Sequence, residues 1–207
     1  TVERSDGMVQ LMVYEPHSED GVQQVTVSYT LQGAVMAWTD TAELYWQFVG
    51  PDWEESSQDV MLVISFPSGS QDAERAVRGE NFRAWGHGPL DGTVEPDATV
   101  PEVRYSVPVV SSGIYAEARV AFPLAWVPEL VASGTGSSEE RLSTIVSEEE
   151  AWAREANERR ERQRSERMVQ SIVMMAVSGA FALVLAVVKA THRSPVPHFG
   201  ETYLDEL

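Results

Sequence analysis

Glu43-Leu-Tyr-Trp-Gln-Phe-Val49 decides the fold class, because Leu44, Trp46 and Phe48 alternate with the more polar residues between them. A period of two residues is that of a β-strand with one buried face. The residues that follow, Gly50-Pro51-Asp52, are turn formers and predict the end of the strand. The stretch therefore predicts a half-buried strand that ends in a turn.

Short apolar or alternating runs of the same kind fill the chain from Met8 to Phe122. Because no amphipathic helix lies between them, they indicate a mainly β fold, an antiparallel immunoglobulin-like β-sandwich over residues 1–132. The nearly all-apolar run Val60–Phe66 is typical of a central strand covered on both faces. The polar, Gly- and Pro-rich segments 69–79 and 89–101 are predicted loops. The predicted strands are Met8–Tyr14, Val22–Leu31, Ala34–Trp38, Glu43–Val49, Val60–Phe66, Phe82–Trp85, Val103–Val107 and Tyr115–Phe122.

A helical stalk is predicted after the β domain. Residues 133–138 are small and indicate a linker, and residues 139–167 contain no Pro or Gly. Glu and Arg alternate there at helical spacing, for example Glu155 with Arg159 and Glu158 with Arg162. The pattern predicts a charged stalk helix that is solvated as a single helix or a weak coiled coil. Packing against a partner helix is the alternative.

The segment from Met168 to Val188 is predicted to be one transmembrane helix, continuous with the stalk. It carries no charged residue, and at 1.5 Å per residue it spans about 31 Å, the thickness of a bilayer core. A helix apolar all round and flanked by Arg does not fit a soluble core. Residues 189–207 then form a short tail on the opposite side of the membrane.

The chain is strongly acidic, with a formal net charge of −17, and the deficit lies within residues 1–150. Such a surface repels phosphates, which excludes nucleic acid as an expected partner and leaves the lipid bilayer. The chain has no cysteine, so disulfides and thiolate metal sites are excluded. We expect no cofactor.

No catalytic motif is visible, and neither catalytic nor metal-binding residues are predicted. His87, flanked by Gly86 and Gly88, could bind a metal or act as a base, but a structural loop is the favoured interpretation. The acidic residues Asp40 and Glu43 could pair as carboxylates of a hydrolase. The remaining weak binding candidates, Trp46 and Trp85, belong to an aromatic-rich set that core packing also explains.

A family resemblance emerges from several of these stretches. Residues 40–50, with Trp53, the strand that ends in Phe66-Pro67, the Trp-Gly-His-Gly-Pro-Leu-Asp-Gly run of residues 85–92 and Ala121-Phe-Pro123 resemble the bacterial predicted membrane proteins of DUF2207 (YciQ-like). The resemblance implies a signal peptide, an extracytoplasmic β domain and a following membrane helix. The chain begins with Thr1 and stops shortly after its helix, so we expect it to be a fragment.

The resemblance implies a plasma-membrane location with the β domain outside. The Arg residues that precede the apolar segment outnumber the basic residues after it and favour the opposite orientation. The expected function is a binding or assembly module of the bacterial cell envelope, with an envelope protein or a glycan as ligand. The alternatives are a cell-envelope hydrolase that uses acidic residues and a structural subunit of a membrane complex.

Overall fold

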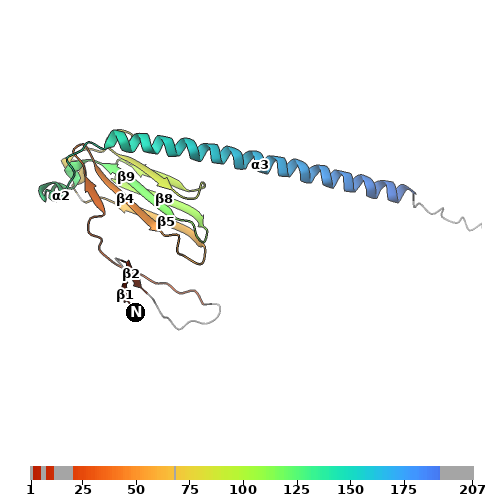
Figure 1. Cartoon of the computed structure of the whole chain (residues 1–207), viewed down its shortest axis with the longest axis horizontal. Helices are drawn as coiled ribbons and strands as arrows, with labels where there is room; N and C mark the ends of the chain where they lie inside the picture. The colour runs from red at the N-terminus through yellow and green to blue at the C-terminus, as the bar shows by residue number, and fades with distance from the viewer. Residues whose placement is uncertain (1, 6–7, 12–20, 68, 192–207) are drawn as a thin grey trace, which may run out of the picture. The chain divides into compact units, whose positions relative to one another are not determined.

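A computed structural model of the chain describes residues 2–5, 8–11, 21–67 and 69–191 (Figure 1). The chain divides into two compact units, Thr1–Ala34 and Val35–Leu207. In the first unit, β1 (Val2–Ser5) pairs antiparallel with β2 (Met8–Leu11). The strand predicted from Met8 is confirmed as far as Leu11, and its last three residues lie outside the described ones.

The segment Val22–Leu31 is not a strand, so this prediction is wrong. The segment is irregular and exposed, and Val22 is 98% exposed. Alternating apolar and polar residues indicate only which face would be buried, whereas a strand forms when a neighbouring backbone completes its hydrogen bonds. Within the described part of the chain, no strand pairs with this segment.

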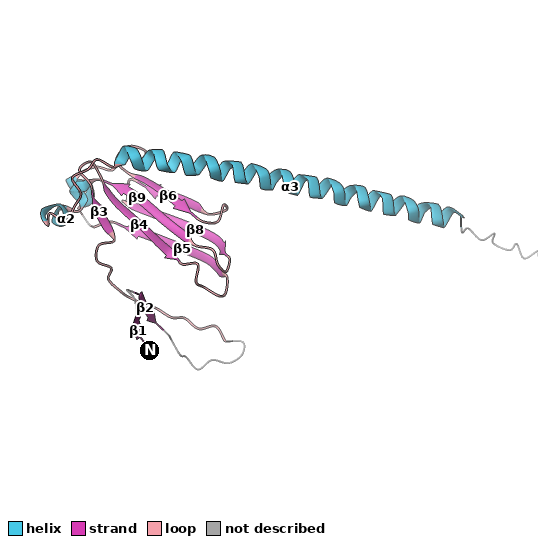
Figure 2. Cartoon of the chain, in the orientation of Figure 1, coloured by secondary structure: helices cyan, strands magenta, loops and turns pink. Residues whose placement is uncertain are grey.

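The second unit contains a four-stranded antiparallel sheet in the order β3-β4-β9-β6 (Figure 2). The predicted strands in this sheet are confirmed, with ends that differ by at most two residues. The tightest pairing joins its two central strands, from Ala42 opposite Phe122 to Val49 opposite Ala116. The strands are β3 (Val35–Ala37), β4 (Ala42–Val49), β6 (Arg83–His87) and β9 (Ala116–Phe122).

A three-stranded antiparallel sheet has the order β5-β8-β7, with β5 (Ser57–Ser65), β7 (Thr93–Asp97) and β8 (Glu102–Val110). The prediction that the run after Val60 forms a central strand is wrong, because β5 lies at an edge and its Met61 is 69% exposed. β7 lies in a segment predicted to be a loop. Its Pro96 obscured the strand, but an edge strand tolerates a residue that cannot donate a hydrogen bond.

One apolar core contains side chains of both sheets. Its centre is aromatic: the ring of Phe66 lies 4.8 Å from that of Phe122 and 4.9 Å from that of Trp126. The indole N–H of Trp126 donates to the carbonyl of Glu74 at 2.8 Å, so its polar atom is satisfied inside the core. Antiparallel sheets are therefore confirmed. The finer assignment to an immunoglobulin-like sandwich stays a prediction.

Among the described residues, three short helices lie in the connections: the first between β5 and β6, and the other two between β9 and the long helix. They are α1 (Ser70–Ala73), η1 (Leu124–Trp126) and α2 (Pro128–Ala132). The following segment, predicted to be a linker, is hydrogen-bonded to the end of β3. Ser137 donates its backbone N–H to the carbonyl of Ala37 at 2.8 Å, and Thr39 donates to the carbonyl of Glu139 at 3.0 Å.

The long helix α3 (Leu142–Thr191) runs without a break through the predicted stalk and the apolar segment. The carboxylate of Asp40 accepts the backbone N–H groups of Arg141 and Leu142 at 2.8 and 3.1 Å, which satisfies donors that a helix start leaves free. Ile145 and Glu149 are buried against the sheet. The prediction of a stalk solvated along its whole length is therefore wrong for these first turns.

The apolar part of α3 agrees with the predicted transmembrane segment Met168–Val188. By length and composition α3 is able to cross a membrane, and none of its apolar window is buried within the structure. A core helix of a soluble protein would be mostly covered by other elements. Among the described residues, α3 is the one helix with this property.

Candidate functional site

The outer face of the four-stranded sheet carries a polar surface. The register places Arg119 of β9 opposite Tyr45 of β4 and opposite Trp85 of β6. His87 of β6 lies opposite Glu117 of β9. Because residues directly opposite in neighbouring strands point to the same face, these five side chains form one surface.

Arg119 is the centre of a buried ion cluster that ties α3 to this surface. It is 2% exposed, and its Nε donates to Glu43 of β4 at 2.7 Å. Its Nη1 donates to Glu148 and Glu149 of α3, each at 3.0 Å. Since one guanidinium joins carboxylates of a strand and of a helix, it holds the first turns of α3 on the sheet.

The surroundings of the cluster set the charge of its members. Burial disfavours the charged form of Arg119, but hydrogen bonds to Glu149 and Glu43 outweigh burial and hold its pKa above the usual value. Burial, and then the hydrogen bond to Glu117, raises the pKa of Tyr45. The Tyr45 hydroxyl therefore stays protonated and donates to Glu117 at 2.8 Å.

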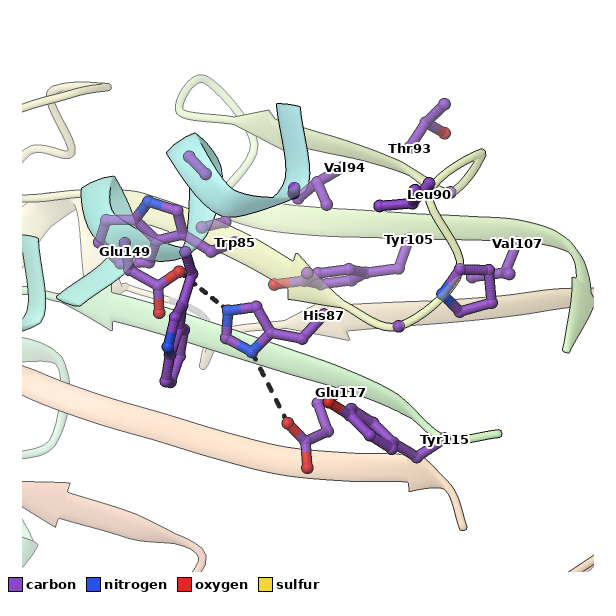
Figure 3. Close-up of a pocket in the computed structure, with 18 of the residues that line it drawn as sticks. Trp85, His87, Leu90, Thr93, Val94, Tyr105, Val107, Tyr115, Glu117 and Glu149 are labelled. Atoms are coloured by element: carbon purple, nitrogen blue, oxygen red, sulfur yellow. Dashed lines mark hydrogen bonds and ion pairs between the residues drawn. The ribbon is translucent and has the colours of Figure 1, made fainter. Parts of the chain in front are cut away.

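His87 bridges β9 and α3. Its Nε2 lies 2.9 Å from a carboxylate oxygen of Glu149, and its Nδ1 lies 3.6 Å from a carboxylate oxygen of Glu117 (Figure 3). The ring of Trp152 from α3 meets the imidazole edge-on, with 4.5 Å between the ring centres. His87 is the last residue of β6, so the prediction that it lies in a loop is corrected.

A cavity of about 600 Å³ opens beside His87. Figure 3 shows this imidazole between Glu149 and Glu117, with Tyr115 beside Glu117. α3 forms one wall, which extends as far as Arg160. The aromatic residues that line the cavity are Tyr45, Phe48, Trp85, Tyr105, Tyr115 and Trp152.

Two glycines of the Trp-Gly-His-Gly stretch shape this cavity. A side chain at Gly86 would place its Cβ 2.9 Å from Val94, so glycine allows β7 to approach β6. Gly88 has a φ of 131°, and a Cβ there would lie 2.5 Å from the backbone oxygen of Tyr115. Only glycine fits both the backbone conformation and the close approach at this position.

A second contact fastens α3 beyond the ion cluster. The guanidinium of Arg160 donates to the carbonyl of Leu90 at 3.0 and 3.3 Å. Leu90 lies in the turn after β6, which the bond from Gly92 N–H to the Pro89 carbonyl closes. Both ends of the cavity wall on α3 are therefore attached to the β domain.

The structure brings together two of the five candidates, Trp85 and His87, which both line the cavity. Trp46 is not among the lining residues. Asp40 binds the start of α3, and Glu43 is buried in the ion cluster.

The hydrolase alternative required Asp40 and Glu43 to face each other in an open cleft. Glu43 instead accepts the indole N–H of Trp38 at 2.8 Å in addition to its bond with Arg119. Asp40 accepts two backbone N–H groups of α3. Both carboxylates are therefore bound to groups of the protein itself, and Glu43 is buried.

The sequence analysis did not single out Arg119, Glu149 or Trp152. Arg119 is the single basic residue in β9 and is followed by the apolar run Val120–Phe122, and Trp152 is the single aromatic residue in the charged part of α3. Both exceptions were visible signals. The pairing of Arg119 with Glu149 could not be predicted, because the two residues are 30 positions apart along the chain.

The acidic and imidazole groups of the described residues do not gather into a metal site. No group of three His, Cys, Asp or Glu side chains in this part of the chain has a geometry that could hold a metal ion. The carboxylates around His87 are instead bound to Arg119 and Tyr45.

The β domain matches a known family model. The family is described as the N-terminal domain of a predicted membrane protein (DUF2207), and the match covers residues 1–122, more than half of the chain. The chain belongs to this family. The match confirms the resemblance to DUF2207 that the sequence indicated. It includes every described strand but not α3.

DUF2207 membership and the apolar segment of α3 agree that this is a membrane protein with one candidate membrane-spanning helix. A membrane protein of this kind contacts the lipid bilayer. No curated protein and no solved structure matches the chain.

Proposed function

We propose that this DUF2207 protein is a membrane-anchored binding module of the bacterial cell envelope, whose ligand occupies the cavity between β6 and α3. One observation carries the proposal: the helix that forms a wall of the cavity is the helix that continues into the apolar segment. A cavity of about 600 Å³ lies within the range of roughly 300–1,000 Å³ that is usual for small-molecule sites.

The attachment of α3 supports a role in communication with the membrane. Ala156 lines the cavity and precedes Met168 by about 18 Å of helix. The helix is bonded to the β domain on either side of this position, through Arg119 and through Arg160. A ligand that moves the cavity wall therefore moves the segment of α3 that enters the bilayer.

We further propose that the ligand is bound without chemical change. Two of the carboxylates that line the cavity, those of Glu117 and Glu149, are bound to Tyr45, His87 and Arg119. Such groups hold a structure together and are poorly placed to exchange protons with a ligand.

Site-specific photo-crosslinking in intact bacterial cells tests the cavity. A benzophenone amino acid at Tyr115, which is 42% exposed and lines the cavity, is expected to form an adduct. The matched control is the same amino acid at Trp53, which is 64% exposed and does not line the cavity. Equal adducts at both positions, or none at Tyr115, would contradict a ligand site there.

The orientation of the β domain is tested by thiol labelling. Single cysteines that replace Ser111, an exposed residue, and Thr202 are introduced separately into the Cys-free chain. A membrane-impermeant reagent is expected to label intact cells at position 111 alone. Labelling at position 202 alone would place the β domain in the cytoplasm, as the Arg distribution favours.

A further inference from the structure

We propose that the cavity binds an uncharged oligosaccharide through its aromatic walls, an inference that rests on the proposed binding function. Tyr115, directly before β9, and Trp152 of α3 line the cavity, and they are 42% and 41% exposed. A sugar ring has an apolar face of C–H groups and a rim of hydroxyls. An aromatic side chain with a polar edge complements both features.

Polar atoms suited to hydroxyl groups accompany these aromatic faces. Within the described residues, no hydrogen bond joins the indole N–H groups of Trp85 and Trp152 or the hydroxyls of Tyr115 and Thr93 to another protein group, and all four residues line the cavity. Glu117 uses one carboxylate oxygen for Tyr45 and His87. Its second oxygen is an acceptor for a ligand hydroxyl.

The charges of the cavity wall favour a neutral ligand. Glu149 is bound to Arg119, and Arg159 lies 3.3 Å from Glu155. Arg160 is occupied by the carbonyl of Leu90. Since Glu149 and Arg159 are already paired within the protein, an ionic ligand that bound either of them would have to break an existing pair.

A cationic ligand would compete with Arg119 for the aromatic rings of the cavity. The guanidinium of Arg119 lies 5.2 Å from the ring centre of Tyr45 and 6.0 Å from that of Trp152, so an internal cation already uses these aromatic rings. The net charge of −17 on the chain repels anionic ligands. Among ligands with both apolar faces and polar edges, uncharged sugars fit the site best.

The test compares three trisaccharides that differ in charge. The full chain in phosphatidylcholine nanodiscs, free of sugar-based detergents, is titrated with neutral triacetylchitotriose, cationic chitotriose and anionic trigalacturonate at millimolar concentrations. Calorimetry and the intrinsic tryptophan fluorescence of the chain report binding. We expect saturable binding of the neutral trisaccharide and weaker or no binding of the two charged ones.

Variants connect the binding to the cavity. Tyr115→Ala is expected to weaken binding of the neutral trisaccharide about tenfold. Tyr115→Phe keeps the aromatic face and is expected to lose less. Trp53→Ala, a change at an exposed aromatic residue outside the cavity, is the control and leaves the affinity unchanged.

The possible outcomes separate this inference from the proposed function. Binding of a charged trisaccharide alone, or an affinity that Tyr115→Ala does not change, would overturn the sugar proposal. Absence of trisaccharide binding together with a cavity adduct in cells would overturn the sugar proposal and leave the binding function in place. Absence of the adduct at position 115 would overturn the binding function itself.

Discussion

Arg119 is the residue on which the attachment of α3 depends. Its guanidinium is 2% exposed and compensates the buried carboxylates of Glu43 and Glu149. A buried ion cluster is weak evidence of net stabilisation, but removing one member leaves the others uncompensated in a poorly solvated place. The side chain therefore acts as an obligatory partner for the acidic residues around it.

We predict that Arg119→Met lowers the free energy of unfolding by about 3–5 kcal/mol, because Glu43 and Glu149 lose their cation. The measurement is chemical unfolding of the chain in nanodiscs. Arg104→Met is the control: Arg104 pairs with Glu102 on the surface, where such a bridge contributes about 0–1 kcal/mol. Equal losses in the two variants would show that the buried cluster does not hold the fold.

The start of α3 shows how an element can depend on a distant side chain. Asp40 lies about a hundred residues before the helix, yet its carboxylate accepts the N–H groups of Arg141 and Leu142. The sequence predicted that the stalk helix begins at residue 139, directly after the predicted linker. The observed start is at Leu142, because the backbone before it is bonded to β3 instead.

We predict that Asp40→Ala destabilises the start of α3 by about 0.5–2 kcal/mol, the usual effect of removing a helix cap. Hydrogen exchange of the first turn of α3 is expected to accelerate, while exchange in β9 changes little. Asp52→Ala, at an exposed acidic residue in the turn after β4, is the matched control. Unchanged protection at Arg141 and Leu142 would show that Asp40 is not the cap.

The turn between β7 and β8 contributes a pH-dependent term to stability. The Thr99 hydroxyl, then the N–H groups of Thr99 and Val100, donate to Asp97 and lower the pKa of its carboxyl. A lowered pKa means that the folded state favours the charged form. The stabilisation is therefore present above the unfolded pKa and is lost as the pH falls through the folded pKa.

We predict that Asp97→Asn lowers the Tm at neutral pH and that the difference from the native chain closes as the pH falls below about 4. Thermal unfolding of both chains over a pH series measures it. Asn keeps an acceptor oxygen but does not titrate, so the comparison isolates the charge. A difference that stays constant down to the lowest pH would contradict the assignment.

The whole molecule is organised by one helix with two environments. The first turns of α3 lie on the sheet, and its apolar window is not buried within the structure. We predict that Val177→Asp combined with Val184→Asp abolishes membrane insertion, since each charge near the bilayer centre costs about 2.5–3.5 kcal/mol. The measurement is alkaline extraction of membranes. The chain with Ala at both positions is the control and is expected to remain in the membrane fraction.

The strands that were predicted correctly and incorrectly differ in where their determinants lie. β4 and β9 were predicted because their own residues alternate or are apolar, and both lie inside a sheet. Val22–Leu31 has the same local pattern but no strand partner among the described residues. β7 has a partner in β8, but Pro96 conceals it in the sequence. Pairing is a non-local property, so local pattern alone could not separate these cases.

The sequence predicted only part of the candidate site, because the site too depends on contacts between distant residues. His87 stood out because Gly86 and Gly88 flank it, and Trp85 stood out as a member of an aromatic-rich set; both residues line the cavity. Asp40 and Glu43, considered only as an alternative carboxylate pair, lie close in the sequence but bind different partners. In the structure, one binds α3 and the other binds Arg119.

By itself, the sequence determined the mainly β character, the family and the apolar segment Met168–Val188. Each of these depends on patterns that extend over about ten to twenty consecutive residues, where the period or the absence of charge is decisive. Only the tertiary structure decided which strands pair, that α3 lies on a polar sheet face, and that a cavity forms beside His87. These features arise from contacts between residues far apart in the chain, such as that of Arg119 with Glu149. A local sequence pattern does not contain the energies of such contacts.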